Sequence, residues 1–192
     1  MNEMNIFTGS YTKPYELIDI NGEAMYSGVL GCVKRSGKDE EIACICSPEV
    51  HEQLSALPIG TRITGTCALR TVVATEQPLV RPVICLLDVR EATGAGEDKV
   101  FLVLTGVANP YKPFSDDSDY RTFSLQFVDE RNDRHLIDCI AYDNMKKRAA
   151  EIEAFTPVTV QGFVHAQNHR GKANNTGSPI NGMVVTYIAK KT

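Results

Sequence analysis

The sequence predicts an all-β protein built from two tandem five-stranded barrels, each with one short helix between its third and fourth strands. Short runs of alternating apolar and polar residues, separated by turn residues, follow one another along the 192 residues. Residues 134–167 have the pattern of a strand, a short helix and a second strand inside this β-rich chain. That order is typical of the middle of an OB fold, so we expect tandem OB-fold barrels.

The second half of the chain repeats the pattern of the first half. Three matches support this: Ile6-Phe7-Thr8-Gly9 with Val103-Leu104-Thr105-Gly106, Ile42-Ala43-Cys44-Ile45 with Ile137-Asp138-Cys139-Ile140, and residues 61–65 with 158–162. Their offsets are 97, 95 and 97 residues, and a nearly constant offset indicates a tandem duplication. We therefore predict one OB-fold domain at 1–92 and a second at 98–192, joined by a polar, glycine-containing linker at 91–98.

In the first half we expect strands at about 5–12, 23–34, 40–46, 61–74 and 80–90. Asn21-Gly22 lies between two apolar runs and predicts a type I′ hairpin turn that joins a long first loop to the second strand. Ser47-Pro48-Glu49 predicts a helix start, because it supplies a capping hydroxyl, a proline at the first helical position and an acid near the helix N-terminus. This helix should end before Pro58.

In the second half we expect strands at 99–108, 120–129, 134–142, 157–167 and 180–188. Asp143 or Asn144 should cap a helix that ends near Glu153. Two long polar loops, at 109–119 and 168–179, join strands one to two and four to five. These are the loops that flank the ligand face of an OB fold.

Composition excludes several classes of protein. The chain is 43% apolar and 23% charged, no stretch approaches the roughly 18 apolar residues of a membrane span, and no secretory signal is visible, so we expect a cytoplasmic protein. The six cysteines form no CxxC pair and have no zinc-like spacing, which predicts buried reduced thiols and no metal. Gly94-Ala95-Gly96 is not a phosphate loop and no catalytic motif occurs, so we predict neither a cofactor nor an enzyme.

Charge is spread unevenly along the chain. The net charge is −4, with 9 Lys/Arg against 14 Asp/Glu in residues 1–100 and 11 against 10 in residues 101–192. Nucleic-acid binders usually carry an excess of positive charge. Any nucleic-acid site must therefore be a local basic surface, and the second half is the better place for it.

Alternation assigns the side chains of the second barrel to its two faces. We expect Phe123, Leu125, Phe127, Ile137, Cys139, Ala141, Val158, Val160, Gly162 and Val164 to point into the core. The outward set is then Tyr120, Thr122, Ser124, Gln126, Leu136, Asp138, Ile140, Tyr142, Thr159, Gln161, Phe163 and His165. An outer face with this many apolar and aromatic residues predicts a binding or packing surface.

The runs LIDCIAYDNMKKRA and TPVTVQGFV resemble the third-strand, helix and fourth-strand region of bacterial single-stranded DNA-binding proteins. In that family an aromatic residue precedes the third-strand apolar run, where this chain has Leu136, and a second aromatic ends it, where this chain has Tyr142. The chain has no tryptophan, has Asp143-Asn144 where a Gly-Lys pair is frequent, and stops shortly after its last expected strand. The resemblance therefore implies a diverged tandem-OB member without the family's acidic C-terminal tail.

The same resemblance implies non-specific binding of single-stranded DNA, with RNA as an alternative ligand, in replication, recombination or mobile-element biology. Members with two OB folds per chain dimerise, so it also implies a homodimer that presents four barrels. Bases would stack on rings and apolar side chains, for which the candidates are Tyr111, Tyr120, Leu136, Tyr142, Phe163 and His165. Phosphates would meet the basic candidates Lys112, Arg121, Arg134, Lys146, Lys147, Arg148, His169, Arg170 and Lys172.

Two alternatives stay open from the sequence. The apolar outer face could instead pack on the sister barrel or on a second subunit, as in a protein-interaction or assembly scaffold that binds no nucleic acid. The first barrel has fewer candidates: three tyrosines, Tyr11, Tyr15 and Tyr26, with the cations Lys13, Arg62 and Arg70 near them. Acidic residues interrupt these cations, so the first barrel is equally consistent with a structural or dimerising role.

Overall fold

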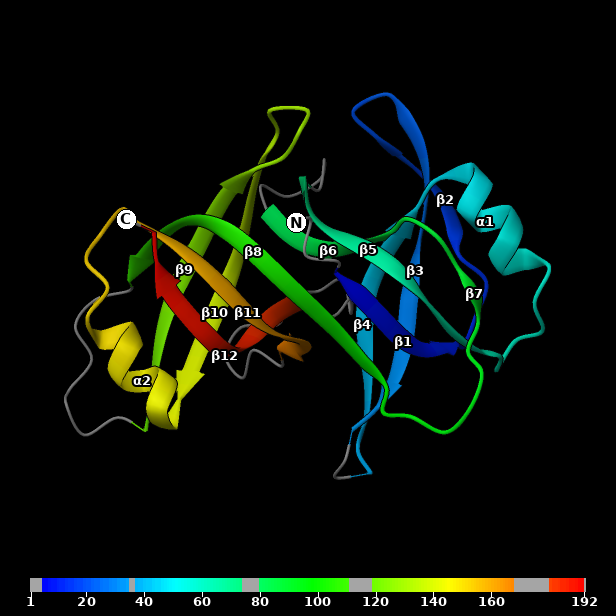
Figure 1. The fold of residues 1–192 in the computed structure, drawn as a ribbon. Coiled ribbons are helices and arrows are strands. Elements are labelled where there is room, and N and C mark those ends of the chain that lie inside the picture. The colour runs from blue at the N-terminus through cyan, green and yellow to red at the C-terminus, as the bar shows by residue number, and fades with distance from the viewer. Residues whose placement is uncertain (1–4, 35–36, 74–79, 111–118, 168–179, 192) are drawn as a thin grey trace.

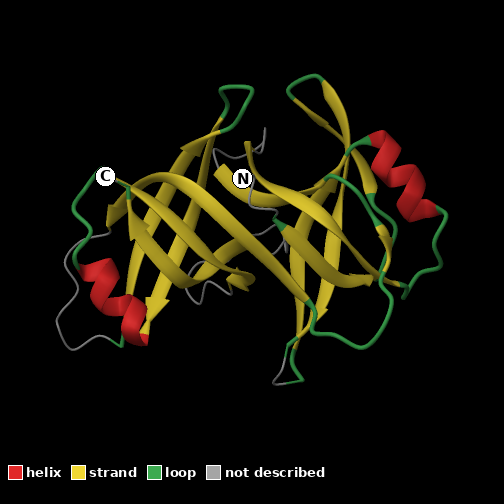
Figure 2. Ribbon diagram, in the orientation of Figure 1, coloured by secondary structure: helices red, strands yellow, loops and turns green. Residues whose placement is uncertain are grey.

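The computed structural model describes residues 5–34, 37–73, 80–110, 119–167 and 180–191. Within these residues, strands dominate and form one sheet of twelve strands, and two short helices lie at the outer flanks of the molecule (Figures 1 and 2). The fold is all-β, as the alternating pattern predicted. None of the helices in the described ranges is both long and apolar enough to cross a lipid bilayer.

The first barrel closes through five strands in the order β1-β3-β4-β6-β5-β1. Its elements are β1 (Ile6–Tyr11), β3 (Glu23–Val33), β4 (Asp39–Cys46), α1 (Pro48–Ser55), β5 (Arg62–Val73) and β6 (Val80–Leu86). Two short strands are attached to it, β2 (Glu16–Ile20) and β7 (Arg90–Glu91). The connection from β4 to β5 through α1 is the one that an OB fold requires.

The second barrel closes in the same order, β8-β9-β10-β12-β11-β8. Its elements are β8 (Lys99–Pro110), β9 (Tyr120–Val128), β10 (Arg134–Tyr142), α2 (Asp143–Ala150), β11 (Thr156–Gln167) and β12 (Ile180–Lys190). Parallel pairing occurs once in each barrel, between β4 and β6 and between β10 and β12. The chain therefore contains two OB barrels in tandem, each with one helix between its third and fourth strands.

The barrel interiors are filled by the residues that alternation assigned to the core. In the second barrel Phe123, Ile137, Cys139 and Val160 are at most 1% exposed. Ser124 was expected outside but is buried, because its hydroxyl donates to the carbonyl of Asn109 on β8 (3.4 Å). All six cysteines are buried and free of disulfides, and burial raises the pKa of their thiols.

The two barrels are joined edge to edge rather than held by a loose linker. β1 and β8 pair as antiparallel strands, with Ile6 opposite Phe101 and Thr8 opposite Lys99, so the sheet runs without a break from one barrel to the other (Figure 1). The predicted domain boundaries, 1–92 and 98–192, stay a prediction, because the sheet continues across the junction between the two barrels. Arg62 holds the expected linker in place, because its guanidinium donates to Asp98 (2.8 Å), Gly94 O (3.0 Å) and Gly96 O (2.6 Å).

Local predictions differ in how well they match the structure. Asn21 and Gly22 both have positive φ, 55° and 83°, as a type I′ turn requires, and the expected first loop is strand β2 of that hairpin. Ser47 caps α1 by accepting from the N–H of Val50 (3.4 Å). The cap predicted for α2 is wrong: the N-cap is Tyr142, no side chain caps the helix, and α2 ends at Ala150 rather than near Glu153.

Candidate nucleic-acid interface

The outer surface of β9 and β10 presents two exposed tyrosines side by side. Tyr120 and Tyr142 are directly opposite each other in the β9–β10 ladder, and their ring centroids are 6.0 Å apart. They are 38% and 42% exposed and form the last pair of the ladder, beside the start of α2. Rings exposed to this extent offer surface on which bases can stack.

The residues that follow on the same surface are also those that alternation assigned to it. Ile140 lies opposite Thr122, Asp138 opposite Ser124 and Leu136 opposite Gln126. Leu136, Asp138 and Ile140 are half-buried. Leu136 is the furthest from the tyrosines, and its backbone N–H donates to the hydroxyl of Thr71 in the first barrel (2.9 Å). Leu136 therefore borders the contact between the barrels and not the tyrosine pair.

Phe163 points outward as expected but belongs to a different part of the surface. It lies opposite Phe101 of β8, and the two rings meet edge to face with centroids 5.2 Å apart. A continuous row of paired residues runs across the strands from a point two residues from the tyrosines to the phenylalanine pair, in the order Thr122, Ile140, Val184, Phe163, Phe101 and Ile6. Phe163 is thus nearer to the junction with β1 than to Tyr142.

Phe101 was not among the residues that we predicted for the outer surface, although alternation along β8 indicates that it points outward. Its neighbours Val100, Leu102 and Leu104 are buried at 5% exposure or less, so alternation along β8 places Phe101 and Val103 outside. The shared face is the outer surface around the β1–β8 junction. It also carries two threonine pairs, Thr8–Thr64 and Thr105–Thr159, with hydroxyl oxygens 3.1 and 2.9 Å apart.

Basic side chains lie near the tyrosine pair on α2, which begins directly after Tyr142. Lys147 is exposed and Lys146 is half-buried. Arg148 already has partners within the barrel: it donates to the carbonyl of Ile188 (3.1 Å) and lies over the ring of Tyr187, 5.9 Å from the centroid. Arg121 lies opposite Ala141, an inward position, so it is on the other side of β9 from the tyrosines. Arg134 is exposed at the far end of β10.

His165 does not face open solvent. Its ring is half-buried at the contact with the first barrel, its Nδ1 donates to Ala166 O (3.4 Å), and its Nε2 is buried without a hydrogen-bond partner among the described residues. Burial lowers the pKa of His165 below the usual histidine value. A half-buried ring at the contact between the barrels offers little surface to a stacked base, so His165 is left out of the proposed interface.

The three candidate cations of the first barrel are engaged in internal ion pairs. Arg62 holds Asp98 and the linker. Arg70 lies 3.9 Å from Glu23, and Lys13 lies 3.8 Å from Glu41. Arg62 is mostly enclosed and is removed from the candidate interface, whereas the exposed Lys13 pair is weak and leaves its ammonium accessible.

Several further candidates lie outside the described residues. These are Tyr111 and Lys112 in the first long loop, and His169, Arg170 and Lys172 in the second. Their assignment stays a prediction. Among the residues that the structure does describe, no group of three or more His, Cys, Asp or Glu side chains is arranged to hold a metal ion.

The corresponding surface of the first barrel is different in kind. Tyr11 and Tyr15 are buried in the core at 3% and 5% exposure, and Tyr26 is stacked on His51 of α1 with centroids 3.5 Å apart. In place of exposed rings, this surface has an aliphatic trough with a volume of about 380 Å³. Its lining includes Ile18, Val29, Ala43, Ile45, Val72 and Val83, with Lys13, Glu16 and Arg81 among the charged residues.

Solved structures of single-stranded DNA-binding proteins have the same fold as this chain. The wild-type protein of Thermus aquaticus superposes with a TM-score of 0.70 at 14% identity, covering 99% of this chain and 93% of that one. A deletion variant of the same Thermus aquaticus protein superposes with a TM-score of 0.64 at 14% identity, covering 99% and 95%. No protein-family model and no curated protein matches the sequence. The chain therefore has the fold that the resemblance of its β10–α2–β11 region implied.

Proposed function

We propose that this protein binds single-stranded DNA without sequence specificity through the outer surface of its second barrel. The observation that carries the proposal is the exposed pair Tyr120–Tyr142, held in register at the end of the β9–β10 ladder that leads into α2. Two rings 6.0 Å apart offer stacking surfaces to successive bases. The likeness in fold to proteins that bind single-stranded DNA supports the same reading.

Lys146 and Lys147 are the cations that we assign to the phosphates next to the tyrosines, because α2 starts at the end of the strand that carries Tyr142. Arg170, Lys172, Tyr111 and Lys112 belong to the two loops that flank this face in an OB fold, and we propose that they complete the interface. Phe163 would contact the strand only where no second chain covers it, and Arg121, on the other side of β9 from the tyrosines, is given no contact. The contacts are with rings and charges, so RNA is a second ligand to be tested.

The experiment is fluorescence anisotropy with labelled oligo-dT and a mixed-sequence strand over a range of salt. We expect binding to weaken linearly on a log–log plot of affinity against salt, since phosphate contacts release counterions. Tyr120→Ala with Tyr142→Ala should reduce affinity by about 1–3 kcal/mol for each base that loses its ring. The matched control is Phe155→Ala, which removes a ring that is 73% exposed in the α2–β11 loop. Absence of binding at low salt, or equal losses in the two variants, would reject the proposal.

We further propose that a second copy of the chain packs on the shared face, giving a homodimer with four barrels. Phe101, Phe163, Ile6 and Val103 make this face apolar at its centre, and 41% of Phe163 is exposed in the single chain. Light scattering should then give twice the chain mass of 21.1 kDa. Phe163→Asp should halve the measured mass and leave the far-UV circular dichroism unchanged. A wild-type mass of one chain would remove the dimer and leave Phe163 free for DNA.

The aliphatic trough favours a second candidate function for the first barrel, the binding of a protein partner. Its lining has no aromatic ring for base stacking, and Met25, Ile45, Val83 and Cys85 form a second apolar cluster beneath it. Val72→Asp should then abolish capture of the partner without changing oligo-dT affinity. A drop in oligo-dT affinity would instead extend the DNA path over both barrels.

A further inference from the structure

Among the hydrogen bonds between the barrels in the described residues, two backbone-to-side-chain bonds lie at equivalent positions beside the shared sheet. In the first latch, the N–H of Thr71 on β5 donates to Nδ1 of His135 on β10 (3.0 Å). In the second latch, the N–H of Ala166 on β11 donates to Oε1 of Glu40 on β4 (2.7 Å). Thr71 and Ala166 are 95 residues apart, and so are Glu40 and His135. Each barrel thus gives one amide and receives one.

The acceptor side chains of the two latches, Glu40 and His135, are each paired with a charged side chain, and these two partners have opposite charges. Glu40 is paired with Lys34 (2.8 Å), and His135 is paired with Asp129 (3.0 Å). Lys34 and Asp129 are also 95 residues apart. A cation therefore supports an anion in the first barrel, and an anion supports an imidazole at the same place in the second.

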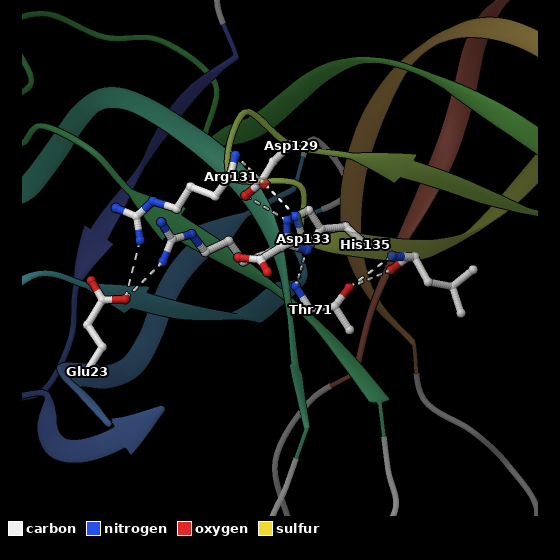
Figure 3. A network of polar contacts seen from close by, with 8 residues as sticks. Glu23, Thr71, Asp129, Arg131, Asp133 and His135 are labelled. Atoms are coloured by element: carbon white, nitrogen blue, oxygen red, sulfur yellow. Dashed lines mark hydrogen bonds and ion pairs between the residues drawn. The ribbon is translucent and has the colours of Figure 1, made fainter. Parts of the chain in front are cut away.

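The hydrogen bonds of the first latch determine the protonation state of His135. A backbone N–H can only donate, so Nδ1 must be the unprotonated nitrogen and the proton of the neutral ring lies on Nε2, where it donates to Asp129. Figure 3 shows His135 held between Asp129 on one side and Thr71 on the other. His135 is 5% exposed. A proton added at Nδ1 would place two buried donors against each other with no acceptor.

The second latch also has a histidine beside it. His165 directly precedes Ala166, and the charges of Glu40 and Lys34, both part of the latch, act on its pKa in opposite directions. Because its Nε2 is buried without a partner among the described residues, protonation there would create an unsatisfied buried donor. The first latch is therefore complete only when His135 is neutral, and the second lies beside an imidazole whose burial also favours the neutral form.

We propose that the contact between the barrels is an acid-sensitive device, in which protonation of His135 and His165 releases the Thr71 and Ala166 latches while the β1–β8 ladder stays paired. The charged group in contact with His135 is Asp129 on its own hairpin (3.0 Å); beyond it, Arg131 bridges to Glu23 of the first barrel (3.4 Å), and Arg70 lies 3.9 Å from the same Glu23. The release acts through the lost Thr71 bond, since the Asp129 contact survives protonation.

The carboxylate of Asp129 also stabilises the turn between β9 and β10. Oδ1 of Asp129 accepts from the N–H groups of Arg131 and Asp133, both at 2.9 Å, and Oδ2 meets His135. Burial raises the pKa of Asp129, but the hydrogen bonds from His135, Asp133 and Arg131 outweigh it and lower the pKa overall. Asp129 thus stays ionised over the range in which histidines titrate.

The experiment measures protection of the Thr71 and Ala166 amides against hydrogen exchange in the full chain, at about pH 7.5 and about pH 5.5, where histidines change charge. After correction for intrinsic exchange rates, protection of both amides should fall roughly three- to tenfold on acidification, as expected for the loss of one hydrogen bond. Amides of the β8–β11 ladder provide the internal reference and should not change. Equal protection of Thr71 at the two pH values would overturn the proposal.

The first barrel supplies a matched variant. Asp129→Lys with His135→Glu copies the Lys34–Glu40 arrangement into the second barrel and should make Thr71 protection independent of pH over this range. If that variant does not fold, His135→Asn keeps an acceptor near Nδ1 without a titrating group and should give the same result. Persistence of the acid-induced loss at Thr71 in either folded variant would show that His135 is not the switch. His165→Gln tests the Ala166 latch in the same way.

Discussion

The two barrels have the same strand order but use one equivalent position for opposite purposes. Position 47 of the first barrel corresponds to position 142 of the second, by the 95-residue offset of their third strands. Ser47 caps α1 through its hydroxyl. Tyr142 leaves α2 without a side-chain cap and instead exposes 42% of its surface beside Tyr120. At this position the second barrel has an exposed ring in place of a helix-capping side chain. Such departures from local helix chemistry are expected at functional surfaces.

The cores show a second contrast. Gly28 on β3 of the first barrel corresponds to Phe123 on β9 of the second, again 95 residues away. Phe123 fills its own barrel, at 1% exposure. In the first barrel the ring of Tyr15 enters over Gly28 and fills the space, and a Cβ on Gly28 would lie 2.1 Å from that ring. The buried tyrosines of the first barrel therefore serve packing, whereas Tyr120 and Tyr142 of the second are exposed at its surface.

The largest expected effect tests this difference in the cores. Gly28→Ala should lower the free energy of unfolding by about 2–3 kcal/mol, because the new methyl group overlaps the Tyr15 ring. Urea denaturation followed by circular dichroism measures it. Tyr15→Leu added to Gly28→Ala should recover part of the lost stability. A double variant no more stable than Gly28→Ala alone would show that overlap with the Tyr15 ring is not the cause of the loss.

Exchange of the cap and the ring sharpens the comparison of positions 47 and 142. Tyr142→Ser should reduce oligo-dT affinity by about 1–3 kcal/mol through loss of a stacking surface. The same change should stabilise the protein by about 0.5–1 kcal/mol by capping α2 as Ser47 caps α1. Anisotropy and urea denaturation of one preparation measure both. Undiminished affinity would move the stacking site away from β10.

A smaller effect distinguishes the cations of the two barrels. Lys146→Ala with Lys147→Ala should reduce the salt slope of oligo-dT binding by about one to two units, one for each phosphate contact that is lost. Lys13→Ala, in the first barrel, should leave the slope unchanged, since Lys13 faces Glu41 rather than the tyrosine surface. The reverse pattern would place the DNA on the first barrel.

The smallest effect concerns the loop before the fourth strand. Gly60 has φ of 92° there in the first barrel, and Phe155 has φ of 63° in the second, a conformation that costs an L-residue energy. Phe155→Gly should raise the free energy of unfolding by about 0.5–1 kcal/mol, since only glycine adopts this conformation freely. Thermal unfolding measures it, with Ile59→Gly as a control expected to destabilise.

Sequence reasoning predicted most of the strands, the two five-stranded barrels and the sides of most residues of the second barrel, because each follows from local alternation and turn chemistry. Tyr120 and Tyr142 were assigned to one surface by period-two alternation alone, and the structure places their rings in contact. The reading was wrong about the α2 cap, where Asp143 has a φ of 46° and the helix starts without a side-chain bond. It also grouped Phe163 and His165 with the tyrosines, since alternation separates inside from outside but does not say which part of the outside.

Local patterns in the sequence were sufficient to predict an all-β protein with two OB barrels that carries Tyr120 and Tyr142 on an outer wall. These properties depend on residues a few positions apart, so they can be recognised from the linear sequence. The pairing of β1 with β8, the contacts of Arg62 with the linker, and the position of His135 and His165 between the barrels became evident from the three-dimensional structure alone. Those contacts join residues that are 30 to 140 positions apart, and no local pattern records which barrel edge meets the other.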